Sequence, residues 1–283
     1  FPWVDNLVRN CYGTSKTYEE GTKLFLKALH GYKAGYYDIT DTNSDYVEDY
    51  KIEEPPYVVP GNKRPLTTPD FEDKILLFKT PQDYCRQGIF EDLFPNAEIK
   101  YIHLTRGFAQ SVNGLMDGWL SDTGFFAYNM DLVNDLELNI KGYSDVKRFG
   151  KKWWKFDLFP NWEQYIEAPL VDVCTQQWWN AHSQIMYHGP KDPLRIKFEN
   201  FLIDKQGITD TICRYLGVQT FHVDDLPQVM ITEKPKAYRW HKRKDDIMEI
   251  WNALGIRPNT GTGSLIRNTM RALGHSTDPE TWI

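Results

Sequence analysis

The sequence predicts an α/β fold in which a central parallel sheet is flanked by helices. Short apolar runs within 73–81, 96–106 and 193–201 have the length and composition of buried strands. Segments of helical periodicity lie between these runs, and strands that alternate with helices pack as a parallel sheet. The 283 residues are enough for one large domain with a substantial core.

We expect a single domain over residues 1–283. Residues 38–73 are polar, acidic and contain prolines, which is typical of a long excursion over the surface. An aromatic insertion is expected near 121–168. Helices are predicted over 17–32, 83–94, 107–119, 169–189 and 204–217, followed by two more after residue 246. In the 169–189 helix, Gln177, Asn180 and Gln184 alternate with apolar faces, which indicates an amphipathic helix.

Composition excludes several classes of partner. The net charge of −6 argues against general attraction to nucleic acid. Cys11, Cys85, Cys174 and Cys213 form no CxxC pair, so we expect reduced thiols and no metal site. No apolar run reaches the length of a membrane span and no signal peptide is visible, so a cytoplasmic protein without a membrane partner is expected. The chain starts at Phe1 rather than Met, which predicts further sequence upstream.

Two cations mark the ends of predicted strands. Arg106 follows one strand and Lys79 ends another. Ligands of open parallel sheets bind at the carboxyl ends of the strands, where the amino termini of the following helices add positive charge. Such a site suits phosphate or sulfate. The alternative is that both cations form ion pairs with Asp83, Glu91 or Asp92.

Three segments resemble the PAPS-dependent sulfotransferases. The most specific is "ILLFKTPQDYCRQGIFEDLFPNAEIKYIHLTRGFAQSVNGL" (75–115), with its lysine-ended strand, "LFPNA" and arginine-ended strand. The second is "PLRIKFENFLIDKQGITDTICRYLGV" (193–218), which is similar to the family's "Y-E-D" strand end followed by a helix. The third, "LIRNTMRALGHSTDPETW" (265–282), is similar to its terminal helix.

The resemblance implies a P-loop NTPase-like sulfotransferase fold. It also implies the sulfonate donor 3′-phosphoadenosine 5′-phosphosulfate (PAPS), the product adenosine 3′,5′-bisphosphate (PAP), and no metal. Arg106 would hold the 3′-phosphate through its fork of N–H donors. Ser111 would add a hydroxyl, although the family's serine falls one helical turn later, at Gly114 here. The alternative for Ser111 is a helix amino-terminal cap.

A basic stretch late in the chain, "YRWHKRKDD" (238–246), matches in charge and order the loop that the family closes over the nucleotide's phosphate. Arg239, Lys242 and Arg243 are therefore expected to bind the cofactor. Trp240 would stack on adenine or anchor the stretch. The alternative is a solvated charged face.

The family's loop for the 5′-phosphosulfate has no clear copy. "CYGTSKTYEEGTKLFL" (11–26) contains Lys16 but lacks a preceding strand. In the tyrosylprotein-type branch, which with the bacterial small-molecule branch is closest in layout, the loop lies further from the lysine strand. It would then precede Phe1, and Glu20 or Glu19 would be the catalytic base. Lys79 would contact the transferred sulfonate or the acceptor side.

These observations predict an enzyme that moves a sulfonate from PAPS to a hydroxyl or amine of a small-molecule acceptor, aromatic or apolar. The alternatives are a non-catalytic nucleotide-binding relic and a P-loop kinase that uses Lys16. His103 and His182 are expected to be structural. The acceptor pocket is expected to draw on some of Trp119, Trp153, Trp154, Trp178 and Trp179, and the others to lie in the core. The sequence does not indicate an oligomeric state.

Overall fold

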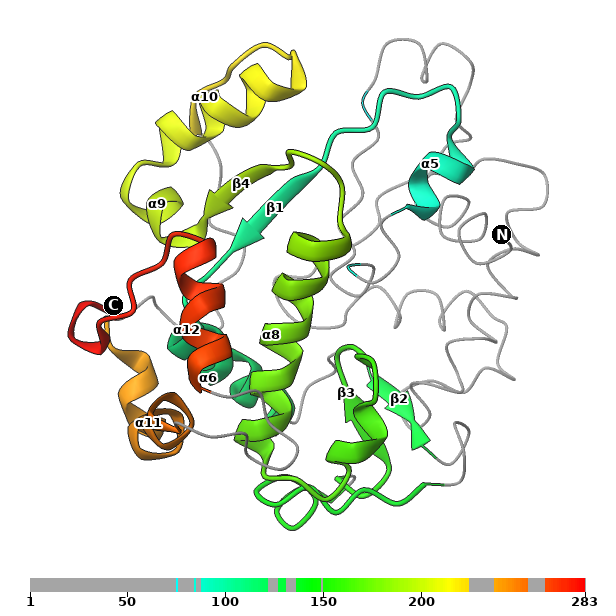
Figure 1. The fold of residues 1–283 in the computed structure, drawn as a ribbon, viewed down its shortest axis with the longest axis vertical. Helices are drawn as coiled ribbons and strands as arrows, with labels where there is room; N and C mark the ends of the chain where they lie inside the picture. The colour runs from blue at the N-terminus through cyan, green and yellow to red at the C-terminus, as the bar shows by residue number, and fades with distance from the viewer. Residues whose placement is uncertain are drawn as a thin grey trace, which may run out of the picture.

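A small parallel sheet forms the centre of the structure, a computed structural model (Figure 1). The structure describes residues 75, 84, 88–121, 127–130, 136–148, 150–223, 237–253 and 263–282. Strand β1 (Ile102–Thr105) pairs in parallel with β4 (Leu194–Lys197), and Thr105 lies opposite Lys197. The predicted parallel pairing is confirmed for these two strands, which are flanked by helices as expected of an α/β protein.

The third predicted strand differs from the structure in length. Residues 193–201 were expected to be extended throughout, but β4 ends at Lys197 and helix α9 (Phe198–Ile203) begins at once. Of the strand predicted at 73–81, only Ile75 is described, and it is 54% exposed and in no strand. The excursion predicted at 38–73 lies outside the described residues.

The long helix α8 (Leu170–His188) lies beside the β1–β4 pair (Figure 1), and His182 of α8 contacts His103 of β1. Its bounds agree with the helix predicted over 169–189, but it is less amphipathic than expected. Gln177 and Asn180 are buried, because Gln177 bonds to Trp119 and to the Lys155 carbonyl while Asn180 bonds to Gln176. These two side chains of α8 therefore bond to protein groups instead of facing solvent.

Helix α6 (Phe108–Leu120) follows β1 directly and packs against α8. The remaining described elements are α5 (Ile89–Leu93), α10 (Lys205–Leu216), the 3-10 helix η4 (Arg239–Arg243), α11 (Lys244–Asn252), α12 (Gly263–Ala272) and η5 (Pro279–Thr281). Gly217 ends α10 in the left-handed region at φ 76°, as its place in the sequence predicted. Cys174 and Cys213 are free and buried, in agreement with the expected reduced thiols.

The aromatic region was expected to be irregular but contains a short antiparallel pair. Strand β2 (Ala127–Asn129) pairs with β3 (Trp153–Lys155), and the 3-10 helix η2 (Trp162–Tyr165) follows. Trp154 of β3 is fully buried between Trp119 and Trp162. Three-residue strands are too short to leave an alternating pattern that stands out among so many aromatic residues.

Trp282 fastens the last described segment to the helices. It is 3% exposed, and its ring lies 4.7 Å from that of Trp251 in α11, 5.4 Å from that of Trp240 in η4 and 6.3 Å from that of Phe108 in α6. The indole of Trp240 donates to the Trp282 carbonyl at 3.4 Å. Trp240 therefore anchors the basic stretch in the core, and its buried ring is not available to stack on a nucleotide.

Gly263 is required where α12 starts against the end of α11. A Cβ at this position would lie 2.5 Å from the carbonyl oxygen of Trp251 and 2.7 Å from that of Ala253, both backbone atoms. We expect Gly263→Ala to lower the free energy of unfolding by about 1–3 kcal/mol through overpacking. Gly88→Ala is the control, since no atom lies within 4 Å of its Cβ position. Equal urea midpoints for the two variants would contradict this packing argument.

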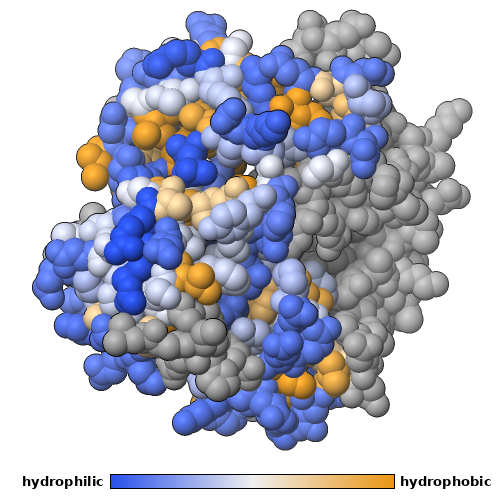
Figure 2. Space-filling model, in the orientation of Figure 1, coloured by the Kyte–Doolittle hydropathy of each residue, from blue (hydrophilic) through white to orange (hydrophobic). Residues whose placement is uncertain are grey.

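On the face seen in Figure 2, the described residues are mainly hydrophilic, with small hydrophobic areas among them. None of the described helices is both long enough and apolar enough to cross a membrane.

Candidate functional site

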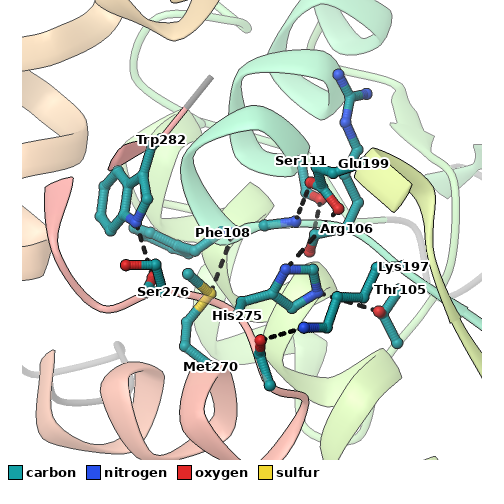
Figure 3. A network of polar contacts seen from close by, with 12 residues as sticks. Thr105, Arg106, Phe108, Ser111, Lys197, Glu199, Met270, His275, Ser276 and Trp282 are labelled. Atoms are coloured by element: carbon teal, nitrogen blue, oxygen red, sulfur yellow. Dashed lines mark hydrogen bonds and ion pairs between the residues drawn. The ribbon is translucent and has the colours of Figure 1, made fainter. Parts of the chain in front are cut away.

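Arg106 stands at the carboxyl end of β1, as predicted, immediately before α6 begins. The residue is exposed, and its guanidinium extends away from the polar network around His275 (Figure 3). Its carbon Cζ lies 5.3 Å from the centre of the Phe198 ring, a cation–π arrangement. Within the described part of the chain the guanidinium is in no ion pair, so the alternative of neutralisation by Glu91 or Asp92 is not supported.

The start of α6 is capped by protein groups. Glu199 Oε1 accepts the backbone N–H of Gly107 at 2.9 Å, and Met270 Sδ accepts that of Phe108 at 3.3 Å. These contacts take up part of the positive end of the helix, which was expected to help bind the anion. An anion at this edge of the sheet would therefore meet side chains along α6 rather than these first two amides.

Ser111 lies one turn into α6 and is not its cap, because the helix begins after Gly107. Its hydroxyl donates to the Arg106 carbonyl at 3.4 Å. A Cβ at Gly114 would lie 3.9 Å from Nη1 of Arg106. Arg106 therefore extends along the face of α6 that carries position 114. The sulfotransferases that the sequence resembles have their serine at this position.

The basic stretch packs against the same helix. Asp117 of α6 forms ion pairs with Arg239 at 3.3 Å, Lys242 at 2.6 Å and Arg243 at 2.7 Å. Arg243 also bonds to the carbonyl and side-chain oxygens of Asn113, 130 residues away in the sequence. The alternative of a solvated charged face fits Lys242, whose side chain is 42% exposed, but not Arg243, whose side chain is 14% exposed.

Arg106 and the basic stretch influence one another electrostatically. Partial desolvation lowers the pKa of Arg106, the Glu199 carboxylate raises it, and the positive charge of Arg239 lowers it again. The guanidinium remains charged at neutral pH. Glu199 acts on Arg106, and Asp117 pairs with Arg239, Lys242 and Arg243, so the four cations are accompanied by two carboxylates. This set of six side chains has an excess of two positive charges.

A second polar cluster lies at the carboxyl ends of β1 and β4 (Figure 3). His275 Nε2 is 3.0 Å from the Thr105 hydroxyl, and its Nδ1 is 3.8 Å from Glu199 Oε2. Lys197 donates to the Gly274 carbonyl. Burial lowers the pKa of His275, and the Glu199 carboxylate opposes this shift. These contacts hold the last described segment beside both strand ends.

Two further histidines are buried where β1 and α8 meet. Nε2 of His103 in β1 lies 3.0 Å from Nδ1 of His182 in α8. Burial and the charge of Arg195 lower the pKa of His103 to about 4. Burial, then His103, His275 and Arg195 lower that of His182 to about 3. Both rings are neutral at pH 7, in agreement with the structural roles predicted for them.

The structure therefore places Arg106 near Arg239, and it gathers Arg239, Lys242 and Arg243 on Asp117 of α6. Ser111 lies in the first turn of the same helix. The other predicted site residues, Lys16, Glu19, Glu20 and Lys79, lie outside the described residues. Of the predicted pocket tryptophans, Trp119, Trp154 and Trp178 are buried in the core, while Trp153 and Trp179 are partly exposed. In the described ranges no cluster of three or more His, Cys, Asp or Glu is arranged for a metal ion.

The sequence reasoning missed Asp117, Asn113 and the role of Glu199. Asn113 and Asp117 are four residues apart, so they share one face of α6. Two polar side chains at that spacing beside buried Val112 and Met116 were the available signal. Comparison with known proteins finds no matching family model, no matching curated protein and no matching solved structure.

Proposed function

We propose that the protein is a sulfotransferase that binds PAPS and holds the nucleotide's 3′-phosphate between Arg106 and the basic stretch. The observation that carries the proposal is that Arg106 extends along α6 beside Gly114, while Asp117 of the same helix holds the basic stretch, which is far away in the sequence. A phosphate dianion matches the excess of two positive charges in this group.

The residues present fit such an anion. Among the described residues, none forms an ion pair with the guanidinium of Arg106, whose fork of donors suits phosphate oxygens. The absence of a side chain at exposed Gly114 leaves the adjacent helix face open. Among the three cations paired with Asp117, Lys242 has the most exposed side chain, at 42%, and adds an ammonium that solvent can reach. Arg243 is held against Asn113 and contributes a fixed positive charge.

Catalysis would draw on residues outside the described ranges. When bound, PAPS supplies a sulfonate that is already activated by its phosphate leaving group. Glu20 or Glu19 would remove the proton of the acceptor hydroxyl or amine. Lys79, or Lys16 if it belongs to the phosphate loop, would neutralise charge near the reacting end of the nucleotide. The acceptor is proposed to be a small aromatic or apolar molecule.

The test is calorimetric titration of the protein with PAP and with adenosine 5′-monophosphate, which lacks the 3′-phosphate. We expect Arg106→Gln to weaken PAP binding by about 1.5–3 kcal/mol, the scale of a charged hydrogen bond, or roughly 10- to 150-fold. It should leave the affinity for the monophosphate nearly unchanged. The parent should prefer PAP by a similar factor.

Arg214→Gln is the matched control, because Arg214 is an exposed arginine in the last turn of α10. It should bind PAP as the parent does. Failure of the parent to bind PAP, or equal losses for both nucleotides in Arg106→Gln, would overturn the assignment of the 3′-phosphate site. A protein that binds PAP but transfers no sulfonate would instead favour the non-catalytic relic.

A further inference from the structure

The convergence of three cations on one carboxylate raises the question of what Asp117 does. It lies on the third turn of α6 and its side chain is 28% exposed. Arg239, Lys242 and Arg243 all reach it from the basic stretch, and Lys242 contacts both of its oxygens, at 2.6 and 2.8 Å. An acidic residue at the centre of an anion site is electrostatically unfavourable for the anion, so its presence there needs a reason.

We infer that Asp117 is a positioning residue that holds the basic stretch against α6 and thereby aims its cations at the 3′-phosphate. This inference rests on the proposed function. Without the carboxylate, three like charges would lie side by side on one short 3-10 helix and would repel one another. With the carboxylate in place, Arg239 is held close enough to Arg106 for the two positive charges to interact.

The rest of the anchoring is directed at the same point. Trp240, between Arg239 and Lys242, is buried in the core, and Asn113 accepts from Arg243 one turn before Asp117. The backbone of the basic stretch is thus fixed by Trp240, and the directions of its charged side chains are fixed by α6. Preorganised donors bind an anion more tightly because less side-chain freedom is lost on binding.

The positioning role and a purely repulsive role of Asp117 predict opposite changes in PAP affinity for Asp117→Asn. If Asp117 only competes with the phosphate for the cations, Asp117→Asn removes a repelling charge and PAP binds more tightly. If Asp117 positions the cations, the same change releases them and PAP binds more weakly. We expect a loss on the order of tenfold, the scale of coupling between members of one ion-pair network.

The experiment is calorimetric titration of the parent and Asp117→Asn with PAP, with Glu137→Gln as the control. Glu137 forms an exposed ion pair with Lys151 at 2.6 Å. Glu137→Gln therefore also neutralises a carboxylate that pairs with a lysine, but in a part of the protein outside the proposed site. In a Lys242→Met background, Asp117→Asn should cost less than it does in the parent. A purely structural effect of Asp117 would be the same in both backgrounds.

The outcomes separate the inference from the proposed function. If the parent and Glu137→Gln do not bind PAP, the proposed function fails. If they bind PAP and Asp117→Asn binds equally well or more tightly, only the positioning role is overturned. Should Asp117→Asn fail to fold, Asp117→Glu carries the test, since it keeps the charge but moves it by one methylene. We then expect a smaller loss, and affinity equal to that of the parent would overturn the inference.

Discussion

Trp119→Ala is expected to lower the free energy of unfolding by about 3–5 kcal/mol, the range for removing a large buried aromatic side chain. Trp119 is fully buried in α6, with its ring 4.7 Å from that of Tyr143 and 5.3 Å from that of Trp154. Neither neighbour can fill the space, because both are themselves held in the core. The cavity would therefore persist and add to the lost transfer free energy.

The indole of Trp119 also has a polar role. Its Nε1 donates to Gln177 Oε1 at 2.9 Å, and Gln177 in turn donates to the Lys155 carbonyl. Trp119→Phe keeps most of the ring but leaves a buried acceptor without its donor, so we expect a cost of about 1–3 kcal/mol. Urea unfolding measures both changes, with Tyr187→Ala as the control for a 73% exposed aromatic residue. Similar midpoints for Trp119→Ala and Tyr187→Ala would show that the core is not packed as described.

Acidification is expected to destabilise the protein through the buried histidine pair. The pKa values of His103 and His182, about 4 and about 3 in the fold, lie below the ordinary value near 6.5 of an unfolded chain. The unfolded state therefore binds more protons between these limits. Stability due to the neutral pair is fully present above about pH 6.5 and is lost as pH falls toward 4, by about 1.4 kcal/mol per pH unit for each proton.

The measurement is the free energy of unfolding in urea at several pH values from 7 to 4, for the parent and for His182→Phe. The phenyl ring keeps the edge contact with Trp178 but cannot be protonated. The variant should lose stability less steeply on acidification, whereas His188→Gln, at the exposed end of α8, should follow the parent. The same slope in His182→Phe and in the parent would contradict the assignment.

Comparison of slopes is needed because another buried group acts in the opposite direction. Burial raises the pKa of the Asp157 carboxyl to about 6, although the hydroxyl of Tyr84, which donates to it, and a backbone hydrogen bond oppose the shift. The folded state then binds more protons than the unfolded one between about pH 4 and 6, so this group favours the fold at lower pH. The parent's total pH dependence is thus a sum, and the histidine contribution appears only in the difference between variants.

Local signals in the sequence were enough to predict the elements that carry the site. The apolar run before Arg106 and the helical periodicity after it predicted β1, α6 and the position of the arginine at their junction. Gly189 and Gly217 likewise predicted where α8 and α10 end. These features depend on residues within a few positions of one another, so the local sequence is enough to predict them.

Long-range pairing was beyond that kind of reasoning. Lys242 donates to Asp117, which lies 125 positions away in the sequence. Glu199 accepts the amide N–H of Gly107, which lies 92 positions away. No periodicity links such residues, so the basic stretch could be associated with Arg106 only through the family resemblance. The buried polar side chains of α8 were misjudged for the same reason, because their partners, such as Trp119 for Gln177, lie on other elements.

The contacts of Trp282 have a consequence for how the protein is made. A ribosome delivers the chain from its amino end, so β1 and α6 emerge long before Trp240 and Trp282 can meet over Phe108. Until then, Arg106 and the exposed face of α6 lack the cationic side chains of the basic stretch. The proposed anion site is therefore completed only after residue 282 has been synthesised and Trp282 has packed against Trp240 and Trp251.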